Sequence, residues 1–256
     1  MLTAVIDSLG AAFLRVATGL GTFILYLVQI VGVLFSFRLK VKKLFEQLYH
    51  IGFESLPIVI LTGSFAGMVF ALQSYVGFQR VGGEQFIGAL VALGMIRELG
   101  PVLTGLMIAG RAGSSMAAQL GTMRISEQID ALITLHINPI QYLVVPRILA
   151  STLMLPCLTL IATACGIVGG YFVCVYVLYL NGHDYITNIT LYVELIDILS
   201  GLAKATVFGF IIGCVGTYKG FYTTDGARGV GRSTTQSVVA SSISILIANY
   251  FLTKLF

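Results

Sequence analysis

The sequence predicts an all-α polytopic membrane protein with about five transmembrane helices. Hydrophobic residues make up 57% of the 256 positions and charged residues only 10%, whereas a soluble domain carries about 25% charged residues. Long runs without a charged side chain recur along the chain, and each reaches the roughly 20 residues that a spanning helix needs. The chain has room for five or six spans with short connections, so a single membrane domain over residues 1–256 is expected.

The first 43 residues are interpreted as an apolar helix followed by a basic elbow. Residues 16–37 contain Gln29 as their one strongly polar side chain, so hydropathy alone allows them to span. The four cations within residues 38–43 belong on the cytoplasmic side by the positive-inside rule. If residues 16–37 span, the N-terminus lies outside; if they lie in the interface, it lies inside. The residues themselves leave both arrangements open.

Five later segments are predicted to span the membrane: 56–78, 86–122, 148–180, 198–217 and 237–256. The first has 23 residues without a charge, which at about 1.5 Å per residue exceeds the ~30 Å hydrocarbon core. The third has 33 residues without a charge, so one tilted or broken helix is expected, with Pro156 as a candidate bend. Two glycine pairs with GxxxG spacing favour close helix packing, Gly63 with Gly67 and Gly209 with Gly213.

Charge in the connecting segments predicts the side on which each lies. Residues 181–197, around His183, contain three acidic side chains and no Lys or Arg. Residues 218–236, around Arg228, contain three basic side chains and one acid. Because cytoplasmic loops carry the excess of Lys and Arg, the first segment is expected outside and the second in a cytoplasmic loop.

Arg97 and Glu98 lie inside the second predicted span, just before Pro101. A charge near the membrane centre costs at least about 2.5–3.5 kcal/mol, so this pair is a candidate functional site. Neighbouring helical residues point about 100° apart and cannot simply neutralise each other. Pro101 lacks an amide hydrogen and crowds the carbonyl of Arg97, which should lose its helical partner. Lys204 is expected either to snorkel outward or to meet Glu98; snorkelling of Arg97 and Glu98 to the interface is the alternative for that pair.

Residues 126–137 are predicted to form a short amphipathic helix between two inward-facing helix ends. Ser126 is expected as its N-cap, with Glu127 and Asp130 near the positive end of the helix dipole. A helix of this kind fits a groove on a partner protein, and the alternative is a surface helix that rests on the lipid headgroups. The residues expected to contact that partner, an ATPase if ATP drives the protein, are Ser126, Glu127, Gln128, Asp130, Leu132 and Ile133.

The chain lacks the motifs of an enzyme that would act alone. There is no Walker A pattern, HExxH or GxSxG in the sequence, so any ATP that drives the protein must be bound by another chain. The four cysteines fall in apolar segments without metal-type spacing, and we expect buried hydrophobes and no metal site or cofactor. A net charge of +4 scattered along the chain does not suggest nucleic-acid binding.

Two stretches carry a resemblance to a known family. The run RELGPVLTGLMIAGRAGSSMAAQLGTMRISEQIDAL, from Arg97 to Leu132, is similar to the signature of the MlaE permease family, the membrane subunits of bacterial ABC transporters for phospholipid. A second run, DGARGVGRSTTQSVV from Asp225 to Val239, resembles that family's loop before the last span. The resemblance extends over nearly the whole chain and implies that the N-terminal helix is interfacial.

The resemblance further implies a multi-pass protein of the bacterial inner membrane that works as a homodimer. Its expected partners are a cytoplasmic ABC ATPase with a STAS-type regulatory subunit, a periplasmic MCE-type lipid-binding ring and the phospholipid substrate. The implied role is movement of phospholipid between the inner and outer membranes, which maintains the lipid asymmetry of the outer membrane. Transport direction, headgroup preference and stoichiometry do not follow from the sequence.

With a lipid substrate, the polar residues inside the membrane become a candidate lipid path. Arg97 would pair with phosphate and Glu98 with an amine, Lys204 or the dimer mate; the alternative is a structural ion pair with a neighbouring helix. An intramembrane lipid-modifying enzyme and a proton-coupled carrier using Glu98 are the competing functions. The candidate lipid-path residues are Phe70, Gln73, Phe78, Val81, Arg97, Glu98, Leu99 and Lys204.

Overall fold

The computed structural model describes residues 14, 18–19, 21–33, 41–80 and 82–255, and every regular element in these ranges is a helix. The α-helices are α2 (Val41–Ile51), α3 (Leu56–Phe78), α4 (Ile87–Gly94), α5 (Gly100–Ile108), α6 (Ser114–Ile125), α7 (Gln128–Thr134), α8 (Val145–Phe172), α9 (Gly182–Tyr192), α10 (Leu195–Phe221) and α11 (Gly226–Leu255). Short π-helical segments at Met95–Leu99 and Ala109–Gly113 join α4, α5 and α6, and two more, Ile140–Val144 and Val173–Val177, flank α8.

Within the described ranges, five helical segments are long and apolar enough to cross a membrane, which confirms the predicted fold class. They are Val41–Phe78, Glu84–Ile125, Ile140–Val177, Leu195–Phe221 and Gly226–Leu255. Several are longer than the spans expected from hydropathy, because a helix continues past the apolar stretch wherever its polar ends pack or reach water. Pro156 lies inside α8 without ending the helix, so the long third run forms one helix that stops at Val177.

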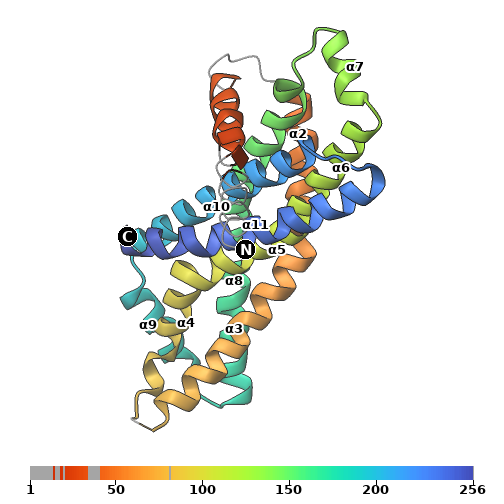
Figure 1. Cartoon of the computed structure of the whole chain (residues 1–256). Coiled ribbons are helices and arrows are strands. Elements are labelled where there is room, and N and C mark those ends of the chain that lie inside the picture. Colours follow the sequence, from red (N-terminus) through yellow and green to blue (C-terminus); the bar gives the residue numbers. More distant parts are fainter. Residues whose placement is uncertain (1–13, 15–17, 20, 34–40, 81, 256) are drawn as a thin grey trace, which may run out of the picture.

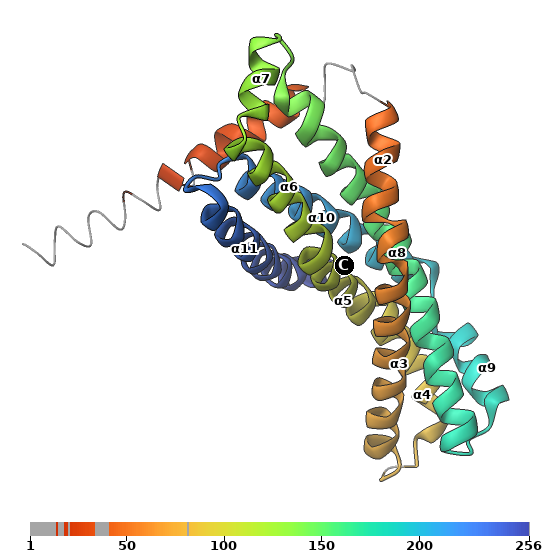
Figure 2. The same cartoon turned by 90° about the vertical axis from the view of Figure 1, so that its right-hand side faces the viewer.

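Helix α8 lies at the centre of the molecule and packs most extensively against α3 and α10. Figures 1 and 2 show α3, α4 and α9 grouped around its lower half, while α10, α11, α5 and α6 form a second group beside its upper half. The turn between α3 and α4 lies at one end of the molecule and α7 at the opposite end. These ends hold the segments that the charge pattern assigns to the outer and inner sides.

Close backbone approach joins α8 to its two main neighbours. A Cβ atom added at Gly63 or Gly67 of α3 would collide with the backbone of Ala162 or Gly166. The second glycine pair lets α10 approach the backbone of α8 around residues 148–152 in the same way. Both GxxxG pairs therefore serve helix packing, as predicted from their spacing.

The prediction of a loop over residues 218–236 is wrong for most of its length, because α11 begins at Gly226. The loop was predicted from the three basic side chains of this stretch, which a helix that continues beyond the apolar span can carry as well. In the fold, small residues instead allow close contact: Gly229 is buried, and the Thr223 hydroxyl donates to Ser233 Oγ at 2.9 Å. The helix thus has 30 residues, which is about eight turns.

The predicted helix 126–137 is shorter than expected, and Ser126 does not cap it. Helix α7 covers seven residues, and its N-cap is Glu127 in the left-handed conformation at φ 58°. The Ser126 hydroxyl donates to the Thr122 carbonyl, so it completes the preceding helix α6. Only two residues, Ser126 and Glu127, separate α6 from α7, and neither has the extended backbone of a capping serine.

In the N-terminal region, Leu14, Thr18 and Gly19 are helical, and Gly21–Val33 form an apolar helix. Its buried Tyr26 and Ile30 pack against the first turn of α8 and against Cys214 of α10. This position beside the inner ends of two spans favours the interfacial arrangement; residues 34–40 of the basic elbow lie outside the described residues.

The helix arrangement predicts opposite exposure of Asn188 on α9 and Arg228 on α11. In a variant with the four native cysteines replaced, a single cysteine at Asn188 should react with a membrane-impermeant thiol reagent added to the outer face. A single cysteine at Arg228 should react only after the membrane is opened. Equal labelling of both positions from the outer face would contradict the topology.

Candidate functional site

A π-helical turn at Met95–Leu99 precedes a proline in the second predicted span. The amide of Gly100 bonds to the Met95 carbonyl, and Pro101 follows without an amide hydrogen that could reach the Arg97 carbonyl. The Arg97 carbonyl accepts a hydrogen bond from Lys204 Nζ at 3.0 Å. A lysine of α10 thus supplies a donor to this carbonyl from another helix.

Among the charged side chains of Arg97, Glu98 and Lys204, that of Lys204 uses its hydrogen-bonding capacity most fully. Its side chain is 2% exposed, and an ammonium has three N–H donors. Nζ donates to the Arg97 carbonyl, to Glu98 Oε1 at 2.6 Å and to Thr253 Oγ1 at 2.8 Å. All three donors are used, which is the condition under which a buried charge becomes tolerable. Lys204 therefore meets Glu98 and does not snorkel outward.

Glu98 connects α10 to the last helix, α11. Besides Lys204, its carboxylate accepts from Thr253 Oγ1 at 3.0 Å and from Asn249 Nδ2 at 3.0 Å. Asn249 and Thr253 are four residues apart, so they lie on one face of α11. Sequence reasoning missed these two residues, although a polar pair at this spacing in an apolar helix was an available signal.

Arg97 points away from this network, as the 100° between neighbouring residues requires. Its side chain is 44% exposed, and Nη1 lies 3.4 Å from Asp197 Oδ1. Asp197 is largely engaged elsewhere, because its other oxygen accepts the backbone amide of Glu194 at the start of α10. Arg97 lines a cavity of about 380 Å³ with Leu93, Tyr192, Glu194, Ile196, Asp197 and Ser200. This cavity offers a half-exposed guanidinium to a ligand.

The other candidate lipid-path residues lie apart from the charged cluster. Phe70, Phe78 and Leu99 pack at the edge of an apolar cluster around Met95 and Val91. Gln73 is exposed on α3, and Val81 lies outside the described residues. The structure thus joins Lys204 to Glu98 and to the Arg97 carbonyl, whereas Phe70, Gln73 and Phe78 lie on α3.

Helix α7 has one inward and one outward face. Ile129 is fully buried, and Leu132 packs beside it against Leu120 and Leu143. Asp130 forms an ion pair with Arg124 at 2.6 Å. Of the remaining positions predicted to contact an ATPase, Ser126, Glu127, Gln128 and Ile133 are exposed, as is Leu135 at the end of the helix. The projection of α7 from the molecule is visible in Figures 1 and 2.

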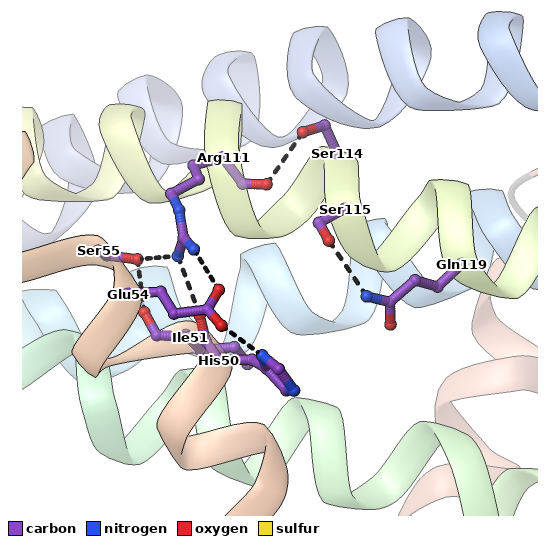
Figure 3. Close-up of polar contacts among 8 residues, drawn as sticks. All are labelled: His50, Ile51, Glu54, Ser55, Arg111, Ser114, Ser115 and Gln119. Atoms are coloured by element: carbon purple, nitrogen blue, oxygen red, sulfur yellow. Dashed lines mark hydrogen bonds and ion pairs between the residues drawn. The ribbon is translucent and has the colours of Figure 1, made fainter.

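A second polar cluster, which sequence reasoning did not identify, lies where α2 approaches the segment Ala109–Gly113 (Figure 3). Arg111 donates to the His50 carbonyl at 2.9 Å, to Ser55 Oγ at 2.6 Å and to Glu54 Oε2 at 2.6 Å. Glu54 also bonds to His50 Nδ1 at 2.7 Å. The contacts fix the end of α2 and the turn after it to the segment between α5 and α6. Within the residues that the structure covers, no three potential ligands gather in a way that suits a metal ion.

Comparison with known proteins identifies relatives along the whole chain. The family model described as Permease MlaE matches residues 44–255. A probable ABC transporter permease protein of Rickettsia felis is 49% identical over all of this chain and 99% of that protein. A probable ABC transporter permease protein of Synechocystis sp. is 43% identical over 85% of this chain and 83% of that protein. The chloroplastic protein TRIGALACTOSYLDIACYLGLYCEROL 1 of Arabidopsis thaliana is 39% identical over 89% of this chain and 65% of that protein.

Loss of the Glu98 carboxylate should destabilise the chain because it leaves the Lys204 ammonium without its counter-charge. Breaking a buried pair costs about 3–5 kcal/mol, and since Glu98 is partly exposed we expect roughly 1–3 kcal/mol for Glu98→Ala. The double variant Glu98→Gln with Lys204→Met should lose less, because no bare charge remains. Thermal unfolding of the purified chain in detergent measures both.

Glu84→Ala is the matched control, because Glu84 lies in the outer turn between α3 and α4, away from the cluster. It should unfold near the wild-type temperature. A Glu98→Ala variant as stable as the control would show that the ion pair does not hold the helices together.

Proposed function

Because the chain belongs to the MlaE permease family, we propose that it moves phospholipid between the inner and outer membranes of the Gram-negative envelope and so maintains outer-membrane lipid asymmetry. The chain is a multi-pass ABC transporter permease. In the proposal it lies in the inner membrane and supplies the lipid path, and a separate chain hydrolyses ATP.

The observation that carries the proposal is the placement of Arg97. Its guanidinium is half-exposed in a cavity near the outer end of α10, and its acidic neighbour Asp197 is 3.4 Å away with one oxygen already used. A guanidinium recognises phosphate in a bidentate fork. Glu194 on the same cavity is exposed and suits the amine of a zwitterionic headgroup. Arg97 is therefore assigned to the lipid, and Glu98 with Lys204 to holding the helices around it.

The proposed assembly is a homodimer with an ABC ATPase and its STAS-type regulatory subunit on the cytoplasmic side and an MCE-type lipid-binding ring on the periplasmic side. Exposed apolar side chains of α7, including Ile133 and Leu135, support a docking role for this helix at the inner end. Helix α11 supports dimer formation, since Ile243, Leu246 and Ile247 expose an apolar face beside the charged cluster.

Substitution of Arg97 should abolish lipid transport and leave assembly intact. Complexes of this chain with its ATPase, reconstituted in vesicles, should move a labelled phospholipid to acceptor membranes only with ATP. Arg97→Gln and Arg97→Lys should each lower that rate at least about tenfold, because neither side chain reproduces the fork. ATPase association and ATP hydrolysis should persist.

The matched control is Arg80→Gln, which removes the same charge from the exposed outer turn. It should transport normally. Normal transport by Arg97→Gln would remove Arg97 from the lipid path, and transport without ATP or an ATPase would favour the proton-coupled carrier.

The coupling role of α7 is tested best at Ile133. Leu132 packs within the chain, so Leu132→Asp would disturb folding as well as docking. Ile133→Asp removes an exposed apolar side chain and should weaken ATPase co-purification, with the chain inserted and dimeric as before. Thr134→Asp on the same helix adds the same charge without removing apolar area. Undiminished co-purification and transport for Ile133→Asp would mean that α7 merely rests on the membrane surface.

A further inference from the structure

A second cavity system lies at the inner end of the molecule, between α2, α6 and the start of α8. Two adjoining cavities of about 170 and 230 Å³ share the side chains of Gln47, His50 and Gln119. Together they form the inner groove. Its lining also contains the charged side chains of Lys43, Glu46, Glu54, Arg111 and Arg147. A water molecule takes up about 30 Å³ of liquid, so the groove has room for a group the size of phosphate with its hydration.

The two arginines of the inner groove differ in their partners. Arg111 is bonded to Glu54, Ser55 and the His50 carbonyl, as Figure 3 shows, so its charge is compensated within the chain. Arg147 is 7% exposed and donates only to two neutral oxygens, the Leu143 carbonyl at 2.7 Å and Gln119 Oε1 at 3.1 Å. Its Nε is buried without a hydrogen-bond partner among the described residues.

No carboxylate of the described residues lies within ion-pair distance of Arg147. Glu46, the acid on the same cavity, is exposed and pairs with Lys43 at 2.9 Å. A guanidinium that is more than nine-tenths buried is costly unless a counter-charge reaches it. Because Arg111 and Glu54 pair with each other, the remaining cations of the groove are Arg147 at its base and Lys43 at its rim, and the remaining acid is Glu46, which is already paired with Lys43.

The surface beside the inner groove indicates where the anion comes from. Val41, Phe45, Tyr49 and Phe53 recur every four residues and are all more than half exposed, so they form an apolar stripe along α2. Tyr49 and Phe53 stack with ring centroids 5.3 Å apart. An amphipathic helix with this stripe lies in the membrane interface. A molecule with a phosphate and acyl chains fits both the groove and the stripe.

We propose that the inner groove binds the phosphate of a phospholipid headgroup from the cytoplasmic leaflet, with Arg147 and Lys43 as its cationic ligands. The acyl chains of that lipid lie along the stripe on α2. This site is separate from the cavity at Arg97, and it requires only the predicted orientation of the chain and no transport activity.

The test uses the full chain in vesicles that contain a phospholipid with a diazirine next to its headgroup. After illumination, mass spectrometry counts adducts on peptides that contain Gln47 or Gln119. Arg147→Gln should lower these adducts at least about tenfold, as expected when a charge-assisted hydrogen bond is removed from a buried site. Arg228→Gln, which removes an exposed inner-end cation on α11, should leave them unchanged.

Three outcomes would overturn the proposal. Adducts that persist in Arg147→Gln would show that the arginine does not hold the headgroup. A diazirine-bearing diacylglycerol that labels the groove equally would show that phosphate is not recognised. Competition by millimolar inorganic phosphate would assign the groove to a soluble anion. If Arg147→Gln fails to fold, Lys43→Gln on the rim takes its place, and unchanged labelling there would overturn the proposal in the same way.

Discussion

Burial of the Lys204 ammonium is the constraint on which the arrangement of the helices depends. A lysine in the interior of a spanning helix must find three hydrogen-bond acceptors and a counter-charge. It finds them on the segment before α5, through the Arg97 carbonyl and Glu98, and on α11 through Thr253. Because Asn249 of α11 also bonds Glu98, one cluster fixes three parts of the chain relative to each other.

The two adjacent charges at 97 and 98 have different roles because a helix turns between them. Glu98 faces the interior and is committed to Lys204, whereas Arg97 faces a cavity and keeps a half-exposed guanidinium. The segment before Pro101 also supplies the carbonyl of Arg97 to Lys204. A structural ion pair at Glu98 and the proposed lipid-binding role of Arg97 are therefore compatible in one short segment.

Patterns local in the sequence predicted much of this fold. Hydropathy located the five spans, the GxxxG spacing marked the faces of α3 and α10 that pack closely, and Pro101 marked the segment whose carbonyl accepts from Lys204. The long-range pairings could not be predicted, because nothing within a helix states which other helix it meets. For this reason, the sequence did not reveal the roles of Asn249, Thr253 and the Arg111 cluster. The predictions for the start of α11 and the N-cap of α7 were wrong because glycine, threonine and serine suit both loops and closely packed helices.

The central claim is that this chain is one subunit of a transporter and acts on phospholipid only together with an ATPase. Purification of the native complex under mild conditions, followed by mass spectrometry of its subunits and bound lipids, tests it most directly. The account predicts two copies of this chain, an ABC ATPase and retained phospholipid. Purified chain that lacks an ATPase in every preparation, yet moves or chemically alters phospholipid by itself, would contradict it.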